Sequence, residues 1–189
     1  NTVPVATAYA YGKYLGHLVL TWDDSGRLIS AEGAPILLDA GVMPDPQIAA
    51  RVTEMSGPIT ELKQQIVAQT AAPINGDRRD CRVGECEMGS LVADAMLDQV
   101  KAQGITIAIM NGGGIRASID EGPITMGDIL EVLPFQNSLS TFRLTGGDIV
   151  AALENGASRY DEQAGRFAQV AGLKYTVDPA APVGARISE

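Results

Sequence analysis

The amino-acid sequence predicts an α+β fold in which a mixed β-sheet packs with helices. Segments whose apolar residues recur at helical spacing, such as residues 88–100, occur together with short apolar segments typical of strands, such as residues 105–110. No internal repeat or low-complexity tract interrupts this pattern. The chain has 189 residues, of which 46% are hydrophobic, so it is long and apolar enough for one domain with a buried core and an additional segment.

The N-terminal part of the chain predicts strands, a helical segment and a loop. We expect a strand over Tyr14–Trp22, a turn after it, and a returning strand that ends near Ile29. Residues 47–69 have helical periodicity with a break at Gly57-Pro58, whereas residues 71–86 are polar and typical of a loop.

Two later helices are predicted from capping boxes, in which a threonine is followed three residues later by an aspartate. The first helix begins after Thr125, and the second begins after Thr145 and ends at Gly156. A strand over residues 138–144 separates the two helices, and residues 166–178 predict a final strand.

The charge balance and the histidine count exclude several classes of function. The formal net charge is -9 at pH 7, so we do not expect binding to a nucleic-acid polymer. His17 is the only histidine, which excludes a self-contained metal site that needs two or more histidines. No apolar run is long enough to span a membrane. The N-terminus lacks a signal-peptide pattern, so the protein is either cytosolic or has had its signal removed.

Cys81 and Cys86 are the only cysteines, and they lie five residues apart. A disulfide between them would close a small loop and contribute about 2 kcal/mol to stability. Such a bridge would indicate an oxidising compartment. Two free thiols are the alternative. A zinc site is not expected, because two cysteines and one distant histidine provide too few ligands.

The segment Asn111–Arg116 (NGGGIR) is the strongest candidate for a ligand site. It follows a predicted buried strand, and ligands often bind beyond the carboxyl ends of strands. At Gly112, Gly113 and Gly114 the absence of side chains would let backbone N–H groups approach an anion. The Arg116 guanidinium can bind a phosphate or a ribose. A tight turn with a solvated arginine is the alternative.

Two other features have both a functional and a structural interpretation. Arg78, Arg79 and Arg82 place three cations within five residues. They form either a focused anion site or a solvated loop in which they pair with neighbouring acidic residues. Phe135 follows Pro134 at the predicted end of a helix. Its ring is either part of the core or available for stacking on a base, which is worth about 1–3 kcal/mol per base.

Taken in order, these motifs resemble the C-terminal domain of the 5'-nucleotidase family, which includes ecto-5'-nucleotidase and the bacterial periplasmic UDP-sugar hydrolases. The resemblance is carried by GDRRDCRVGECEMGSLVADAM, NGGGIRASIDEGPITMGDILEVLPFQNSL, LTGGDIVAALENG and GRFAQVAGLKYTVDP, within residues 45–189. Residues 1–39 resemble the closing strands of the family's N-terminal metallophosphoesterase domain. The resemblance therefore implies a remnant of that domain over 1–39, an inter-domain helical linker over 40–70, and a nucleotide-binding domain over 71–189 that is incomplete at its C-terminus.

The resemblance, together with the motifs above, assigns a substrate-binding role to a set of residues. They are Arg78, Arg82, Asn111, Gly113, Gly114, Arg116 and Phe135. By resemblance the arginines contact the ribose or phosphate region, the asparagine contacts the base, and the phenylalanine stacks on one face of the base. Cysteines at the positions of Cys81 and Cys86 form a disulfide in the ecto-enzyme, which favours the bridge and export to the periplasm or the extracellular space.

Neither catalytic residues nor metal ligands are expected in this chain. By resemblance, two divalent metal ions, for example Zn or Mn, lie in an N-terminal domain upstream of Asn1, where a metal-bound hydroxide attacks the phosphorus. A second stacking aromatic would lie downstream of Glu189. The sequence therefore predicts the nucleotide-recognition domain of a phosphoric monoester hydrolase, inactive as a fragment, with a nucleotide or nucleoside as its ligand. The alternatives are a parent enzyme for UDP-sugars, 2',3'-cyclic nucleotides or dinucleotides, and a non-catalytic binding or adhesion module.

Overall fold

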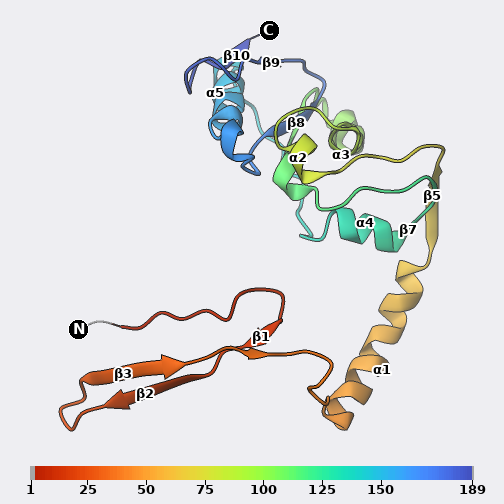
Figure 1. Ribbon diagram of the computed structural model, residues 1–189. Coiled ribbons are helices and arrows are strands. Elements are labelled where there is room, and N and C mark those ends of the chain that lie inside the picture. Colours follow the sequence, from red (N-terminus) through yellow and green to blue (C-terminus); the bar gives the residue numbers. More distant parts are fainter. Residues whose placement is uncertain (1–2, 189) are drawn as a thin grey trace. The chain divides into compact units, whose positions relative to one another are not determined.

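A computed structural model describes residues 3–188, which form two compact units (Figure 1). The first unit extends to Ser56, and the second begins at Gly57. Helix α1, Pro46–Lys63, crosses the boundary between them. Both helices and strands occur in the second unit, as an α+β fold requires.

The first unit contains two short antiparallel strand pairs. The pairs are β1, Tyr14–Leu15, with β4, Ile36–Leu37, and β2, Leu18–Trp22, with β3, Leu28–Gly33. The prediction of one strand over Tyr14–Trp22 is therefore wrong, because the strand is interrupted at residues 16–17. These residues lie opposite Ala34-Pro35, and Pro35 has no N–H to donate to the ladder. The returning strand also continues past its predicted end at Ile29.

Helix α1 differs from its prediction at two points. It is continuous through Gly57-Pro58, where we expected a break. Pro58 removes one backbone donor, but the surrounding helix is exposed, so water can solvate the carbonyl that loses its partner. The helix ends at Lys63, and the residues expected to be helical up to Gln69 instead form strand β5, Ile66–Thr70.

Two antiparallel strand pairs and a terminal hairpin form the sheet structure of the second unit. The pairs are β5 with β7, Gly122–Thr125; β6, Ala108–Asn111, with β8, Ala168–Ala171; and β9, Thr176–Val177, with β10, Ile187–Ser188. Partner strands in the first two pairs are far apart in sequence. Helical periodicity near residue 66 is therefore overridden by pairing with a distant strand, which local patterns do not report.

Two of the predicted strands in this unit are wrong in extent. The strand predicted over 105–110 begins only at Ala108. The strand predicted over 166–178 is divided into β8 and β9, because the chain turns at Gly172, whose φ of 76° favours glycine.

The strand predicted over residues 138–144 does not form. This segment has no strand pairing among the described residues. It lies across an open pocket of about 470 Å³ from residues 105–109. The pocket leaves the segment without a neighbouring strand, and its apolar side chains Leu139, Phe142 and Leu144 are exposed.

The predicted helices of the second unit are confirmed. They are α3, Glu87–Val100; α4, Met126–Val132; and α5, Gly146–Ala157. The prediction of a loop over residues 71–86 is wrong at residues 78–81, which form the short helix α2, Arg78–Cys81, with Asp77 as its N-cap. Both capping boxes are present. At the start of α4, Asp128 Oδ2 accepts the Thr125 N–H at 2.8 Å, and Thr125 Oγ1 accepts the Asp128 N–H at 3.2 Å.

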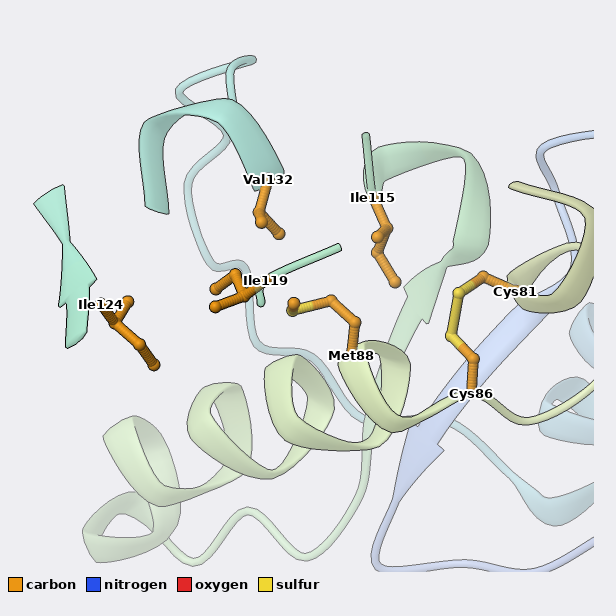
Figure 2. Close-up of a cluster of buried hydrophobic side chains, with 7 residues drawn as sticks. All are labelled: Cys81, Cys86, Met88, Ile115, Ile119, Ile124 and Val132. Carbon is orange, nitrogen blue, oxygen red and sulfur yellow. A yellow bond between two sulfur atoms is a disulfide. The ribbon is translucent and has the colours of Figure 1, made fainter. Parts of the chain in front are cut away.

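The main core of the second unit gathers side chains from the disulfide loop, α3, the segment after β6, β7 and α4 (Figure 2). Its buried members are Cys81, Cys86, Met88, Ile115, Ile119, Ile124 and Val132. Figure 2 shows Met88 pointing from α3 toward Ile119 and the bridge between Cys81 and Cys86 beside Ile115. This core therefore connects the loop that contains the arginine cluster to the segment that contains Arg116.

Candidate functional site

The glycine turn that follows β6 is fixed by close packing. The N–H groups of Gly112 and Gly113 donate to the carbonyls of Phe167 and Gly165, at 2.7 and 2.8 Å. A Cβ at Gly112 would lie 2.0 Å from the Cys81 carbonyl oxygen, and one at Gly113 would lie 2.7 Å from Gly165. For Gly112 and Gly113 the expected anion contact is therefore wrong, because both amides already have acceptors within the chain. The glycines are needed for the approach of the neighbouring backbone.

Arg82 is the buried cation of the site, with a relative exposure of 8%. Its Nη1 donates to the carbonyl of Gln163 at 3.3 Å, while its Nε has no hydrogen-bond partner among the described residues. Burial, followed by the nearby charges of Arg78 and Arg116, lowers the pKa of Arg82 below its ordinary value. The charges of Arg78 and Arg116 therefore both act on the Arg82 guanidinium, and an anion bound beside it would offset their effect.

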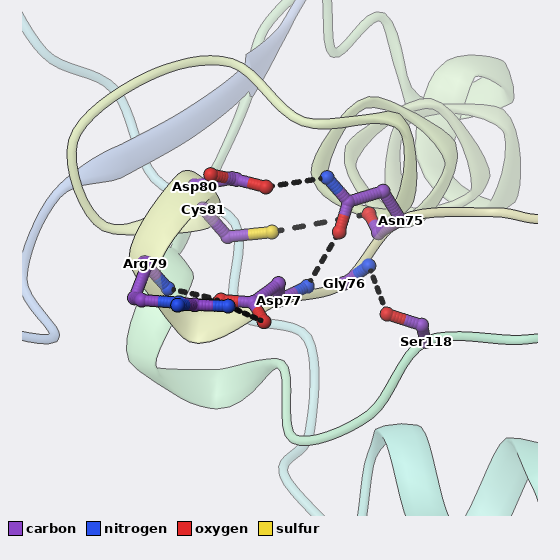
Figure 3. Close-up of polar contacts among 7 residues, drawn as sticks. All are labelled: Asn75, Gly76, Asp77, Arg79, Asp80, Cys81 and Ser118. Carbon is purple, nitrogen blue, oxygen red and sulfur yellow. Dashed lines mark hydrogen bonds and ion pairs between the residues drawn. The ribbon is translucent and has the colours of Figure 1, made fainter.

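The loop before Arg82 is held by a set of short polar contacts (Figure 3). Asn75 donates from Nδ2 to Asp80 at 2.7 Å and accepts from the N–H of Asp77 at 2.8 Å. The Gly76 N–H donates to Ser118 Oγ at 2.9 Å, which ties the loop to the segment after Arg116. These contacts fix the start of α2.

Within the arginine cluster, only Arg79 pairs with an acidic neighbour among the described residues. Asp77 accepts the Arg79 backbone N–H at 2.7 Å and lies 3.2 Å from its Nε, and this contact lowers the pKa of Asp77 (Figure 3). Arg78 and Arg82 have no ion-pair partner among residues 3–188. The interpretation of the cluster as a solvated, paired loop therefore holds for Arg79, and the two arginines assigned to the site retain their charge for a ligand.

The predicted disulfide between Cys81 and Cys86 is present and buried. It closes the loop that contains Arg82. Its Cys86 sulfur accepts the Gly89 N–H at 3.3 Å and caps the start of α3. The free-thiol alternative is thereby excluded.

Arg116 and Phe135 lie against each other. The guanidinium carbon is 5.7 Å from the centre of the ring, within the range of a cation–π interaction. The Arg116 N–H donates to the carbonyl of Val132 at 3.0 Å, which fixes this residue beside the end of α4. Phe135 is 55% exposed, so its ring is not part of the core and one face can receive a planar ligand.

Asn111 and the segment 163–165 complete the site. Asn111 Nδ2 donates to the carbonyl of Gly165 at 3.1 Å. A Cβ at Gly165 would lie 3.6 Å from the guanidinium carbon of Arg82. The segment 163–165 thus contacts both residues, although sequence reasoning did not assign it. Its contribution is made by backbone atoms, which leave no residue-type signal in the sequence.

The arrangement combines a group of unneutralised cations with an exposed aromatic ring. Such a site can bind an anionic group attached to a planar ring system. Among residues 3–188, no group of three or more His, Cys, Asp or Glu side chains is placed to hold a metal ion. No helix in the same range is long and apolar enough to cross a membrane.

Comparison with known proteins gives consistent matches. A family model described as 5'-nucleotidase, C-terminal domain, matches residues 63–189. The chain is 37% identical over 197 residues to a 5'-nucleotidase from Diplobatis ommata, which covers 99% of this chain and 34% of that protein. It is 36% identical over 195 residues to a 5'-nucleotidase from Homo sapiens, which covers 98% of this chain and 34% of that protein.

A solved structure also matches nearly the whole chain. The crystal structure of a 5'-nucleotidase precursor from Thermus thermophilus has a TM-score of 0.70 and 41% identity, and the match covers 93% of this chain and 35% of that one. This agreement confirms the α+β fold class. The chain spans about a third of the length of the curated relatives that it matches.

Proposed function

This chain belongs to the 5'-nucleotidase family and carries its C-terminal domain, and from that premise we propose that it is the nucleotide-recognition part of a 5'-nucleotidase. The family assignment made from the order of the motifs is confirmed. The proposed whole-protein reaction is hydrolysis of a nucleoside 5'-phosphate to nucleoside and phosphate.

The observation that carries this proposal is the environment of Arg82. A buried guanidinium with a free Nε and two further arginines within electrostatic range is costly without an anion. We propose that Arg78, Arg82 and Arg116 bind the phosphate and ribose, and that Phe135 stacks on the base. In this proposal Asn111 contacts the base, Gly113 forms part of the wall of the site without donating to the phosphate, and Gly114 keeps the substrate-binding role predicted for it.

The chemistry of phosphate release belongs, in this proposal, to another domain. The described residues do not fit a two-metal site, because they offer no cluster of metal ligands. We therefore derive no catalytic step from this chain. Two divalent metal ions held by a metallophosphoesterase domain would generate the attacking hydroxide. Residues 1–39 are proposed to be the final strands of that domain, 40–70 the linker, and 71–189 the recognition domain.

The proposed location is the periplasm or the extracellular space. The buried disulfide supports an oxidising compartment, because thiols are kept reduced in the cytosol. The proposed ligand is a small nucleotide and no nucleic-acid polymer, consistent with the net charge of -9.

The test is a binding measurement on the full-length protein with nucleoside 5'-monophosphates, by titration calorimetry. We expect Phe135→Ala and Arg116→Ala each to weaken binding by about tenfold. Arg159→Ala is the matched control, because Arg159 is an exposed arginine that pairs with Glu162. Equal affinities for all three variants would remove the proposed site.

Two extensions of this experiment separate the alternative functions. A panel with UDP-sugars, 2',3'-cyclic nucleotides and dinucleotides shows whether another substrate class binds more tightly. Phosphate release by the full-length protein with added Zn or Mn distinguishes an enzyme from a binding module. The 189-residue chain alone, under the same conditions, should release no phosphate above a denatured control. Release above that control would contradict the division of labour.

A further inference from the structure

The side chain of Gln169 is an unusual polar group in the middle of strand β8. It is 2% exposed, yet its amide makes three hydrogen bonds to the backbone of one loop. Nε2 donates to the carbonyls of Cys81 and Gly84, at 2.9 and 2.7 Å. Oε1 accepts the Cys86 N–H at 3.3 Å. One amide therefore satisfies three buried or half-buried backbone groups of the loop that contains Arg82.

The space for this amide is created by a glycine on α3. A Cβ at Gly89 would lie 2.1 Å from Gln169 Oε1 and 2.4 Å from Cδ. Such distances do not occur between real atoms, so the position of Gln169 depends on the absence of a side chain at residue 89. Helix α3, strand β8 and the Arg82 loop are thus packed to atomic contact around this one amide.

Gln169 and the residues that contact Arg82 belong to the same part of the chain, which is strand β8 and the segment just before it. Gln169 pairs in register with Met110 of β6, one residue before Asn111. The segment just before β8 provides Gln163 and Gly165, against which the Arg82 side chain lies. Gln169 therefore fixes the backbone on one side of Arg82 to the element that supports its guanidinium on the other side.

The disulfide cannot do this alone. The bridge joins Cys81 to Cys86 and closes the loop on itself, whereas Gln169 attaches the closed loop to β8. Without the amide, the carbonyls of Cys81 and Gly84 lose their donor, and residues 81–86 lose their side-chain hydrogen bonds to β8. The guanidinium would then lose its fixed position beside Gly165.

We propose that Gln169 is a positioning residue for nucleotide binding, which acts by holding Arg82 in place. The proposal rests on the function proposed above. Gln169 does not touch the ligand in this proposal; its effect on affinity passes through Arg82.

The test is a double-mutant cycle in the full-length protein, with affinity for a nucleoside 5'-monophosphate as the readout. Gln169→Met keeps the size of the side chain and removes all three hydrogen bonds, and we expect about tenfold weaker binding. In an Arg82→Met background the same change should cost less than about twofold, because the group through which it acts is gone. Gln99→Met is the matched control, since Gln99 is exposed on α3, and it should leave affinity unchanged.

A second readout does not depend on nucleotide binding. Hydrogen exchange at the Cys86 amide should accelerate about tenfold in Gln169→Met, while amides in the middle of α3 keep their protection. Gln169→Asn, which retains the amide with a shorter reach, serves where the methionine variant does not fold, and it should change exchange and affinity in the same directions.

The outcomes are distinct. If the double variant loses affinity by the product of the losses in Gln169→Met and Arg82→Met, the proposal is overturned, because Gln169 then does not act through Arg82. Unchanged exchange at Cys86 would also overturn it. A wild-type protein that binds no nucleotide would refute the proposed function, and the exchange measurement would then decide the attachment of the loop by itself.

Discussion

The two units of the chain contain similar apolar residues, but among residues 3–188 only the second unit buries them. In the first unit no described residue is buried, and Leu18 and Trp22 on β2 are 44% and 55% exposed. In the second unit Ile124 on β7 is 6% exposed and Met88 on α3 is 2% exposed. A strand pattern therefore predicts pairing, while burial requires a second layer. Among the described residues, only the second unit has helices packed on its strands, through α3 with β6 and β8.

The largest expected effect is at Met88. Met88→Ala removes a buried side chain from the main core and should lower the free energy of unfolding of the second unit by about 2–5 kcal/mol. Trp22→Ala, in the exposed first unit, should change it by less than about 0.5 kcal/mol. Hydrogen exchange at the amides of α3 measures the free energy of unfolding of the second unit in both variants. A Trp22 effect as large as that of Met88 would show that the two units share their stability.

Removal of the disulfide should have the next largest effect. The double variant Cys81→Ala with Cys86→Ala removes the constraint on a short loop in the unfolded state. The free energy of unfolding should therefore fall by about 2 kcal/mol. Chemical denaturation before and after substitution gives the difference. The loss should be confined to the second unit, and an unchanged midpoint would show that the buried bridge adds nothing to the packing around it.

A smaller effect is expected at the start of α4. Thr125→Ala removes the side-chain cap and should lower the free energy of unfolding by about 1 kcal/mol. Thr141→Ala is the control, since Thr141 is exposed in a segment without regular structure. If both threonines prove equally dispensable, the capping box does not stabilise the second unit.

The last expected effect appears only at alkaline pH. Burial, with a minor contribution from Glu85, raises the pKa of Tyr175 to about 12, and the phenol donates to the Ala168 carbonyl at 2.6 Å. Because the folded state holds this proton more tightly, the associated stability is complete below about pH 10 and is lost as the pH rises toward 12.

Denaturation curves at about pH 9 and about pH 11.5, on either side of the ordinary tyrosine pKa, provide the measurement. The wild-type protein should lose more stability over this interval than Tyr175→Phe, which has no proton to release. Equal losses in the two proteins would assign the alkaline instability to other groups.

Local signals explain which parts of the fold were predictable. The helices α4 and α5 begin where a threonine and an aspartate lie three residues apart, so a short local motif specifies each start. Strand β5 could not be predicted, because its sequence has helical periodicity and its partner β7 lies far along the chain. Segment 138–144 has the composition of a strand but no neighbour with which to pair among the described residues.

The proposed site is recognisable in the sequence where side chains would carry its chemistry. Arg116 lies against Phe135 in the structure, and the charges of Arg78 and Arg116 act on Arg82. The contributions of Gly165 and Gln169 were not predictable. Gly165 acts through its carbonyl, and a single glutamine in a strand gives no signal until its three hydrogen bonds are known.

The packing of the glycine turn limits which substitutions the proposed ligand site can accept. The Cys81 carbonyl lies where a side chain at Gly112 would begin, and the backbone of Gly165 lies where a side chain at Gly113 would begin. Any mutation that adds a side chain here must displace the disulfide loop or the start of β8. New ligand preferences, in evolution or in a mutant library, are therefore expected to arise at exposed positions such as Arg78 and Phe135, where a substitution displaces no backbone.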